Sequence, residues 1–165
     1  MYYQEQNITC YLLFGFLSII AITSCDTTSP DIEEPMWAQV NQTEWIADEI
    51  AYHGSISFVN NDTSSDHTII YGLSSTNGRI VLYTTEPILS LGTYGILLKD
   101  STIPSYYWPQ GEGFESVFNA VSGEVVVSKF NNGEVSGSFK LTGRSEDARK
   151  VVITDGQMEN LGTNN

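Results

Sequence analysis

Short runs of β-branched and aromatic residues, separated by Ser, Thr, Asn and Gly, fill the chain from residue 36 onward. Runs of this kind at regular spacing are typical of an all-β domain. No stretch in this part of the sequence repeats with a helical period long enough to predict a helix. We therefore expect a single antiparallel sandwich or a flattened up-and-down barrel of about eight to ten strands in sequential hairpins.

The opening residues predict a short hairpin in which residues 36–40 pair with residues 44–46. Trp37 and Trp45 are placed to pack, and we expect both in the core. Residues 47–53 fit either a further strand or one helical turn.

A second hairpin is predicted around Asn77-Gly78, a pair that favours a tight turn. A strand at residues 55–59 and a polar loop at residues 60–66 come before it. The strand before the turn, residues 68–74, alternates apolar and polar positions, and so does the strand after it, residues 79–84. The apolar side chains of both arms are expected to point the same way: Ile69, Tyr71, Leu73, Ile80 and Leu82.

The clearest hairpin joins residues 124–130 to residues 134–141 across Asn131-Asn132-Gly133. In its second arm apolar residues alternate with polar ones, which indicates one buried and one solvated face of an antiparallel sheet. The expected buried set is Val135, Gly137, Phe139 and Leu141. A final strand is predicted at residues 151–158, after a loop at residues 143–150.

An apolar run from Tyr11 to Ile22 precedes the β region and leads into Thr23-Ser24-Cys25. The run is 12 residues long, whereas a helix that spans a hydrocarbon core needs about 20 residues. Its length is that of the apolar part of a signal peptide, although no Lys or Arg precedes it. The residues ending at Cys25 resemble the lipobox of bacterial lipoproteins, which implies cleavage before Cys25 and acylation of its sulfur.

These features divide the chain into four parts. We expect a lipoprotein signal peptide at residues 1–24, the acylated Cys25 with a flexible tether at residues 25–35, a single all-β domain at residues 36–162 and a disordered tail at residues 163–165. Two or more acyl chains hold a protein stably on a bilayer. The expected location is therefore the cell envelope, on the outer membrane, either facing the periplasm or exposed at the surface.

Charge narrows the choice of partners. The chain has 7 Lys and Arg against 20 Asp and Glu. Glu5 lies in the expected signal peptide, so the remainder carries 7 − 19 = −12. Because nucleic-acid binding depends on neutralising phosphates with Lys and Arg, we expect no nucleic-acid partner. Acylation of Cys25 and removal of Cys10 leave no thiol for a disulfide or a Cys-ligated zinc. We also expect a monomer without cofactor or metal.

Several segments, in order, resemble small lipoproteins of Bacteroidetes that carry a C-terminal all-β domain of unknown function. Trp37-Ala-Gln-Val-Asn-Gln-Thr-Glu-Trp45 is similar to their W-x-V-N-G-x-x-W opening, with Gln42 in place of the usual glycine. Leu91-Gly-Thr-Tyr94 resembles their G-x-Y strand start, and the hairpin after Ser122 resembles their G-x-V-x-I pattern. Val152-Ile-Thr-Asp-Gly-Gln-Met158 resembles their closing I-T-N-G-x-F. The resemblance implies a lipid-anchored β domain and no particular activity.

Signals for catalysis are weak in this sequence. His53 and His67 are the two histidines, and they lack the spacing of metal ligands; no Gly-x-Ser-x-Gly turn occurs. Asn60-Asn61-Asp62 and Asp66 gather oxygen donors in one predicted loop, but without the spacing of a calcium loop. We therefore assign no catalytic residue and no metal ligand.

The strongest candidate for binding is an aromatic loop at residues 106–114, which also contains glycines and one acid. Exposed tyrosine and tryptophan rings can stack on sugars or anchor a partner protein. The alternative interpretation is that these rings cap the open end of the barrel. The candidate ligand-binding residues are Tyr106, Tyr107, Trp108 and Phe114.

Three functions are compatible with the sequence. The first is a non-enzymatic binding or interaction module for a glycan or a protein. The second is a structural or accessory lipoprotein, including an immunity-type protein whose acidic surface docks on a basic partner. The third is a hydrolase built on a pair of carboxylates, because a chain this rich in Asp and Glu contains many possible pairs.

Overall fold

The computed structural model describes residues 35–60 and 63–163. The expected signal peptide, Cys25 and the tether up to residue 34 lie outside the described residues. The described part contains ten strands and one 3-10 turn: β1 (Met36–Val40), β2 (Thr43–Ile46), β3 (Ile50–Asn60), β4 (Thr63–Ser74), β5 (Gly78–Tyr83), β6 (Gly92–Gly95), β7 (Tyr106–Trp108), η1 (Phe114–Ser116), β8 (Phe118–Asn131), β9 (Glu134–Arg144) and β10 (Lys150–Leu161).

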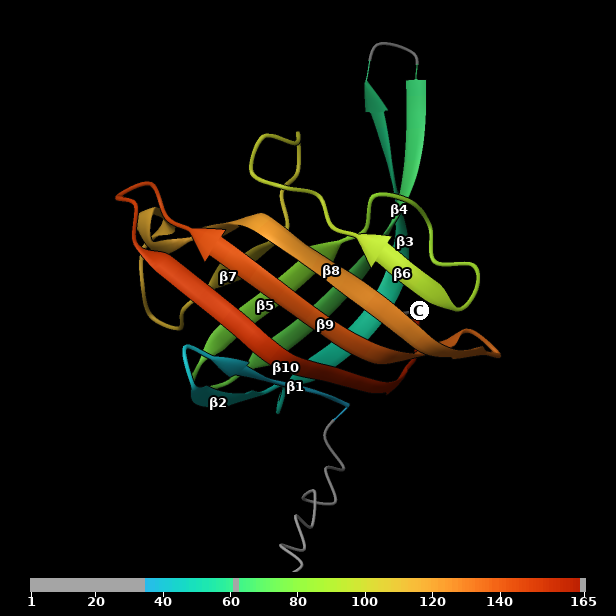
Figure 1. Cartoon of the computed structure of the whole chain (residues 1–165), viewed down its shortest axis with the longest axis horizontal. Helices are drawn as coiled ribbons and strands as arrows, with labels where there is room; N and C mark the ends of the chain where they lie inside the picture. Colours follow the sequence, from blue (N-terminus) through green and yellow to red (C-terminus); the bar gives the residue numbers. More distant parts are fainter. Residues whose placement is uncertain (1–34, 61–62, 164–165) are drawn as a thin grey trace, which may run out of the picture. The chain divides into compact units, whose positions relative to one another are not determined.

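The strands form one antiparallel sheet in the order β2-β1-β10-β9-β8-β7-β5-β4-β3, and β6 pairs with β8 beside this path. The sheet curls into a half-barrel, with β8, β9 and β10 in the front of Figure 1 and β3, β4 and β5 behind them. The prediction of an all-β, antiparallel, hairpin-based fold of eight to ten strands is confirmed, and of its two architectures the half-barrel is closer to the barrel.

The core lies inside the curl. Large side chains from β1, β2, β5, β9 and β10 meet there with almost no exposed surface: Met36, Trp45, Ile80, Leu82, Leu141, Ile153 and Met158. The predicted buried face of β9 is confirmed, because Val135, Gly137, Phe139 and Leu141 all point inward. Burial of side chains of this size stabilises the fold by about 1.5–3 kcal/mol each.

The two edges of the sheet are brought together by the chain itself. β2, one edge strand, is followed at once by β3, the other edge strand, through residues 47–49. Ala47 N–H donates to Met36 O (2.9 Å) and Glu49 N–H donates to Leu73 O (3.2 Å), so this link is bonded to both β1 and β4. Trp45 Nε1–H donates across the interior to Gly78 O (3.2 Å).

His53 bonds the edge strand β3 to the residues that follow β10 and to the β8–β9 turn. Its backbone N–H donates to Gly162 O (3.1 Å), and it forms a β-bridge with Thr163. Its side-chain Nε2 lies 2.7 Å from Gly133 O in the β8–β9 turn. We call this contact between β3 and the residues after β10 the seam. Thr163, which the sequence analysis assigned to a disordered tail, takes part in it.

The predicted faces of the β4–β5 hairpin were wrong. Tyr71 pairs with Val81 and Gly72 pairs with Ile80, so Ile80 and Leu82 do not share a face with Tyr71. The inward face carries Ile70, Gly72, Ile80 and Leu82, and the outward face carries Ile69, Tyr71 and Leu73 with their partners in β5. Both faces of these strands are apolar, so the pattern of apolar positions did not reveal which one the rest of the chain covers.

Three further predictions differ from the structure. Residues 63–66 belong to β4 rather than to a polar loop, and Asn60 pairs with Thr63. β8 and β9 are 14 and 11 residues long, against seven and eight predicted residues, because bulges let the strands bend and continue. Trp45 is fully buried as expected, but Trp37 lies on the other face of β1 and is only half-buried.

Across residues 35–60 and 63–163, no helix has the length and apolar content to span a membrane.

Candidate functional site

The candidate aromatic segment begins as a strand rather than a loop. Tyr106 and Tyr107 pair with β8, while Tyr106, Tyr107 and Trp108 pair with β5, so β7 fills the gap between these two strands. Pro109 follows and ends the strand, as expected of a residue without a backbone donor. Gly111, at φ +74°, then lets the chain turn back toward η1.

Because side chains alternate along a strand, β7 divides the four predicted binding residues. Tyr107 points into the barrel, is 8% exposed and donates its hydroxyl to Asn77 O (2.8 Å). Tyr106 and Trp108 point outward. Phe114 lies at the start of η1, is 79% exposed and has its ring centroid 4.6 Å from that of Trp108. The structure thus brings three of the four residues to the outer side, and Tyr107 caps the barrel end.

The outward side chains of β3, β4, β5 and β7 form a continuous aromatic surface. Tyr52 pairs with Tyr71, Tyr71 with Val81, and Val81 with Tyr106, so these residues form one row across the strands. The next row brings Leu73, Arg79 and Trp108 together. We call this surface the tyrosine face, and its members are Tyr52, Tyr71, Arg79, Val81, Tyr83, Tyr106 and Trp108.

Val81 shows how densely the tyrosine face is packed. It points away from the barrel interior, yet it is only 1% exposed, because the side chains of its row and of Arg79 and Tyr83 cover it. Burial raises the pKa of Tyr83 and, despite the nearby positive charge of Arg79, also that of Tyr106. The face is therefore an ordered, partly dehydrated surface.

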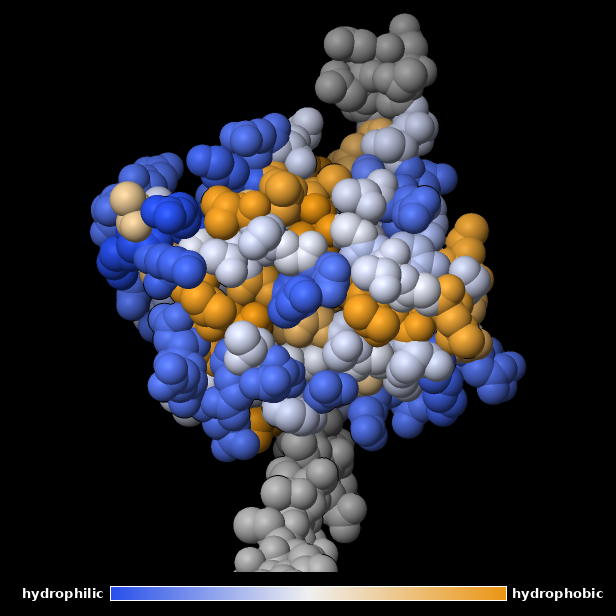
Figure 2. All heavy atoms as spheres, viewed as in Figure 1, coloured by the Kyte–Doolittle hydropathy of each residue, from blue (hydrophilic) through white to orange (hydrophobic). Residues whose placement is uncertain are grey.

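The tyrosine face is also free of acidic residues in a strongly acidic protein. Residues 50–61, 67–85 and 101–111, which include the outward positions of the face, contain no Asp or Glu. The outer side of the opposite wall, which β8, β9 and β10 present in Figure 2, instead shows hydrophobic residues separated by hydrophilic ones. Aromatic residues and Arg without acids are the composition of protein interface cores.

Several aromatic rings of the face are in contact with neighbouring groups. Tyr52 and Tyr71 stack with centroids 5.2 Å apart and planes 23° apart. The guanidinium carbon of Arg79 lies 4.2 Å from the centre of the Trp108 ring, a cation–π contact. Trp108 Nε1–H donates to Glu112 O (3.0 Å), which fixes the loop that follows the strand. The rings are thus held in place before any ligand arrives.

A cleft lies beside Arg79 on this face. It has a volume of about 290 Å³ and is bounded by Tyr71, Leu73, Arg79 and Trp108, with the backbone turn of residues 109–112 as its wall. We call it the Arg79 cleft. Gly78 lies at its base, where φ is +83° and a Cβ would be 2.0 Å from Trp108 O. Only glycine allows β7 to approach β5 this closely.

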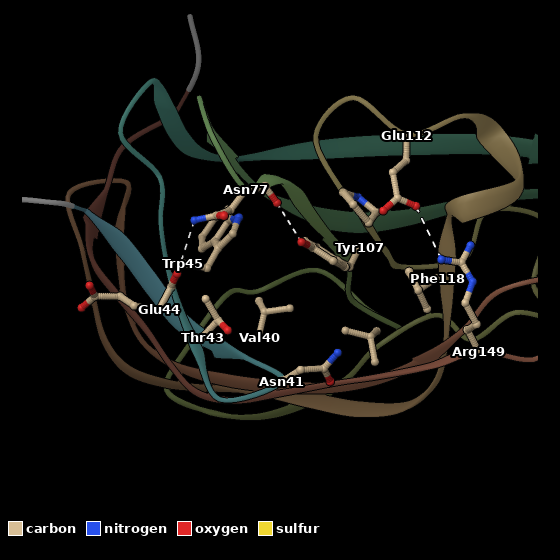
Figure 3. Close-up of a pocket in the computed structure, with 12 residues that line it drawn as sticks. Val40, Asn41, Thr43, Glu44, Trp45, Asn77, Tyr107, Glu112, Phe118 and Arg149 are labelled. Atoms are coloured by element: carbon tan, nitrogen blue, oxygen red, sulfur yellow. Dashed lines mark hydrogen bonds and ion pairs between the residues drawn. The ribbon is translucent and has the colours of Figure 1, made fainter.

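A second hollow, the end cavity, lies at the barrel end on the other side of the same turn. It has a volume of about 330 Å³, and its lining includes Trp45, Tyr107, Phe118, Glu112 and Arg149. Figure 3 shows that its polar groups bind one another: Tyr107 to Asn77, Asn77 to Glu44, and Glu112 to Arg149. Its aromatic residues are almost fully buried. The cavity therefore offers little open surface to a ligand.

Arg149 holds this end of the barrel together. Its Nε donates to Asp147 Oδ2 (2.8 Å), its Nη2 donates to Ser116 Oγ (3.0 Å), and its Nη1 lies 3.6 Å from Glu112 Oε2. The hydrogen bond to Asp147 is the main cause that raises the pKa of Arg149. The side-chain hydroxyl of Ser145 donates to the same carboxylate and lowers the pKa of Asp147. With two carboxylates beside it, Arg149 has no need of an anionic ligand.

The residues considered for catalysis or metal binding have structural partners. His67 has both ring nitrogens bonded, Nδ1 to Thr84 O (2.8 Å) and Nε2 to Ser65 Oγ (2.9 Å). Asp66 accepts from Ser57 Oγ (2.6 Å), while Asn61 and Asp62 lie outside the described residues. Among the described residues, no group of three or more His, Cys, Asp or Glu is placed to hold a metal ion.

No family model matches this chain, and neither the curated proteins nor the solved structures contain a match.

Sequence reasoning singled out residues 106–108 as part of a candidate binding loop, but it missed most of the tyrosine face. Tyr52, Tyr71, Arg79 and Tyr83 lie far from Tyr106 along the chain and meet it only through strand pairing. One signal was available in the sequence, namely the long stretches without acids that contain these aromatic residues.

Proposed function

We propose that this protein is a lipid-anchored, extracytoplasmic binding module, without catalytic activity, whose tyrosine face binds another protein. Cys25 supplies the anchor, and the location is the cell envelope, on the outer membrane. The proposal places the chain among small Bacteroidetes lipoproteins with an all-β domain, which it resembles in its ordered motifs.

The observation that carries the proposal is the acid-free, aromatic composition of one wall in a chain that is otherwise strongly acidic. Exposed apolar patches on soluble domains mark interaction sites. Tyr and Trp supply large contact areas at low entropic cost, and a preorganised surface loses less freedom on binding. Ile50, which is 49% exposed, and Leu73 extend the face with aliphatic surface.

A protein ligand is favoured over a glycan because of the state of the rings. Stacking on a sugar needs an open ring face. On the tyrosine face, Tyr52 and Tyr71 stack on each other, and Trp108 contacts both Arg79 and Phe114. With these rings already in contact with other groups, the hydroxyl groups and aliphatic side chains of the face are available to a ligand. Such a surface suits the mixed chemistry of a polypeptide.

The proposal is tested by photo-crosslinking in the native cells. A photoreactive phenylalanine analogue replaces Tyr71 or Trp108 in one set of strains and Thr142 or Gln157, outward on the opposite wall, in a matched set. We expect protein adducts of defined mass only from positions 71 and 108. Equal adducts from both walls, or none from the tyrosine face, would contradict a protein-binding role for it.

A glycan screen with the purified chain supplies the second arm of the test. Replacing Tyr71 and Trp108 by Ala should not abolish the binding of any glycan. A glycan that does bind in this manner would transfer the role of the face from protein to carbohydrate recognition.

A further inference from the structure

Arg79 differs from the two cations that form ion pairs in the described part of the chain. Arg149 lies beside two carboxylates, and Lys140 pairs with Glu124 at 2.8 Å. Among the residues that the structure describes, no carboxylate lies within ion-pair distance of Arg79; its charged group rests on the Trp108 ring. The one carboxylate residue lining the Arg79 cleft is Glu112, whose Oε2 lies 3.6 Å from Arg149.

The contact with the Trp108 ring holds the guanidinium group beside the cleft without using its N–H donors. An arginine presents five donors in a planar fork that matches a carboxylate in a bidentate manner. The cleft beside it is about 290 Å³, enough for a carboxylate side chain with its methylene groups. Apolar surface from Tyr71 and Leu73 borders this space and would remove water from such a pair, which strengthens it.

We infer that the Arg79 cleft is the specificity site of the tyrosine face and receives an Asp or Glu side chain of the partner protein, flanked by apolar residues. The inference rests on the proposed function and specifies its ligand chemistry. Charge complementarity supports it, because Arg79 lies on the acid-free wall and no carboxylate of the described residues pairs with it. The apolar residues of the partner on either side of this Asp or Glu would pack on Leu73 and on the tyrosines of the tyrosine face.

The test uses the full chain, purified in detergent and labelled with ¹⁵N-arginine. The sequence contains three arginines, at positions 79, 144 and 149, so the spectrum has three Nε–H signals that single Arg→Lys variants assign. The probes are acetyl-Leu-Glu-Leu-amide and the same peptide with Gln in place of Glu. Arg144, exposed and outside the cleft, and Arg149 serve as internal controls.

We expect the Glu peptide to shift the Arg79 signal and to bind at least roughly tenfold more tightly than the Gln peptide, as a charge-assisted hydrogen-bonded pair implies. Arg79→Gln should abolish this preference, and Arg79→Lys should retain only part of it because an ammonium group lacks the planar fork. Equal shifts by both peptides, or a Glu-dependent shift at Arg144 or Arg149 alone, would overturn the inference. Tighter binding of trigalacturonate than of the Glu peptide would overturn the choice of a polypeptide.

The two proposals fail separately. If the cell-based crosslinks are absent but the Glu peptide still shifts Arg79, the protein-binding function fails and the carboxylate site stands. If crosslinks form at Tyr71 and Trp108 but the peptides do not differ, the function stands and the role of Arg79 fails.

Discussion

Gly72 of β4 lies directly against Trp45 of β2. A Cβ atom on Gly72 would be 2.7 Å from Cη2 of Trp45 and 2.6 Å from Sδ of Met36. The two large side chains occupy the space that a side chain at position 72 would need. This contact determines which face of the β4–β5 hairpin points inward, and it makes Gly72 a sensitive position.

Replacing Gly72 by Ala should therefore destabilise the fold by about 1–3 kcal/mol, the usual penalty of overpacking a core. Gly54→Ala in β3 is the matched control, since its Cβ would be 3.5 Å from Ile69 Cγ2, an ordinary contact. The control should be neutral or slightly stabilising. Urea unfolding followed by tryptophan fluorescence measures both variants. Equal urea midpoints for Gly72→Ala and Gly54→Ala would contradict the prediction, because they would show that Met36 and Trp45 move aside without loss of stability.

The seam between β3 and the residues after β10 yields a second prediction, at His53. His53→Ala removes the part-buried contact between Nε2 and Gly133 O (2.7 Å), and loss of an ordinary hydrogen bond costs about 0.5–1.5 kcal/mol. We also expect faster hydrogen exchange at the amide of residue 53, which donates to Gly162 O. Ser55→Ala, at an exposed position of the same strand, is the control. If hydrogen exchange became faster to the same extent throughout the core and at the seam, a local role of His53 would be contradicted.

Asp48 makes stability depend on pH. Ser75 donates to this carboxylate through its hydroxyl and its backbone N–H, both at 2.6 Å, and these bonds lower the pKa of Asp48. Its contribution is fully present above the unfolded pKa of about 4 and is lost as the pH falls through the lower folded pKa. Asp48→Ala should lower the urea midpoint at pH 7, and the difference from wild type should shrink toward pH 3. A difference that is constant with pH would exclude this linkage; Glu49→Gln is the control.

Cys25 provides a test of the anchor. In cells fed an alkyne-labelled palmitate analogue, the wild-type chain should become labelled and remain with the membrane fraction, because acyl chains supply about 0.8 kcal/mol per buried methylene. Cys25→Ala should be unlabelled and should leave that fraction after washing. Cys10→Ala is the matched control and should behave like wild type. Label that survives in Cys25→Ala would refute acylation at this sulfur.

Local signals in the sequence were sufficient for much of the fold. Asn77-Gly78 and Asn132-Gly133 supply turn positions with positive φ, at Gly78 (+83°), Asn132 (+51°) and Gly133 (+79°), and both hairpins form there. In β9, polar residues alternate with Val135 and Phe139, so only one face can be buried. Where a strand has one apolar face, the alternation alone determines its orientation.

The candidate site was less accessible to sequence reasoning. Tyr106, Trp108 and Phe114 were recognised as a group because they are close along the chain. Their assignment to a loop was wrong for Tyr106 and Trp108, because three consecutive aromatic residues show no alternation and only the open position between β5 and β8 makes them a strand. Arg79 had no local signal, since its place over Trp108 results from pairing across two strands.

The sequence by itself determined an antiparallel β domain, its main hairpin turns and an acidic charge, because turn propensity, alternation and composition are local properties. Only the tertiary structure decided which side of β4 and β5 became core. Both sides are apolar, and the choice followed from Trp45 and Met36 filling the space over Gly72. Tyr52, Tyr71 and Tyr106 were thereby left together on the outer wall, where no local pattern could have placed them.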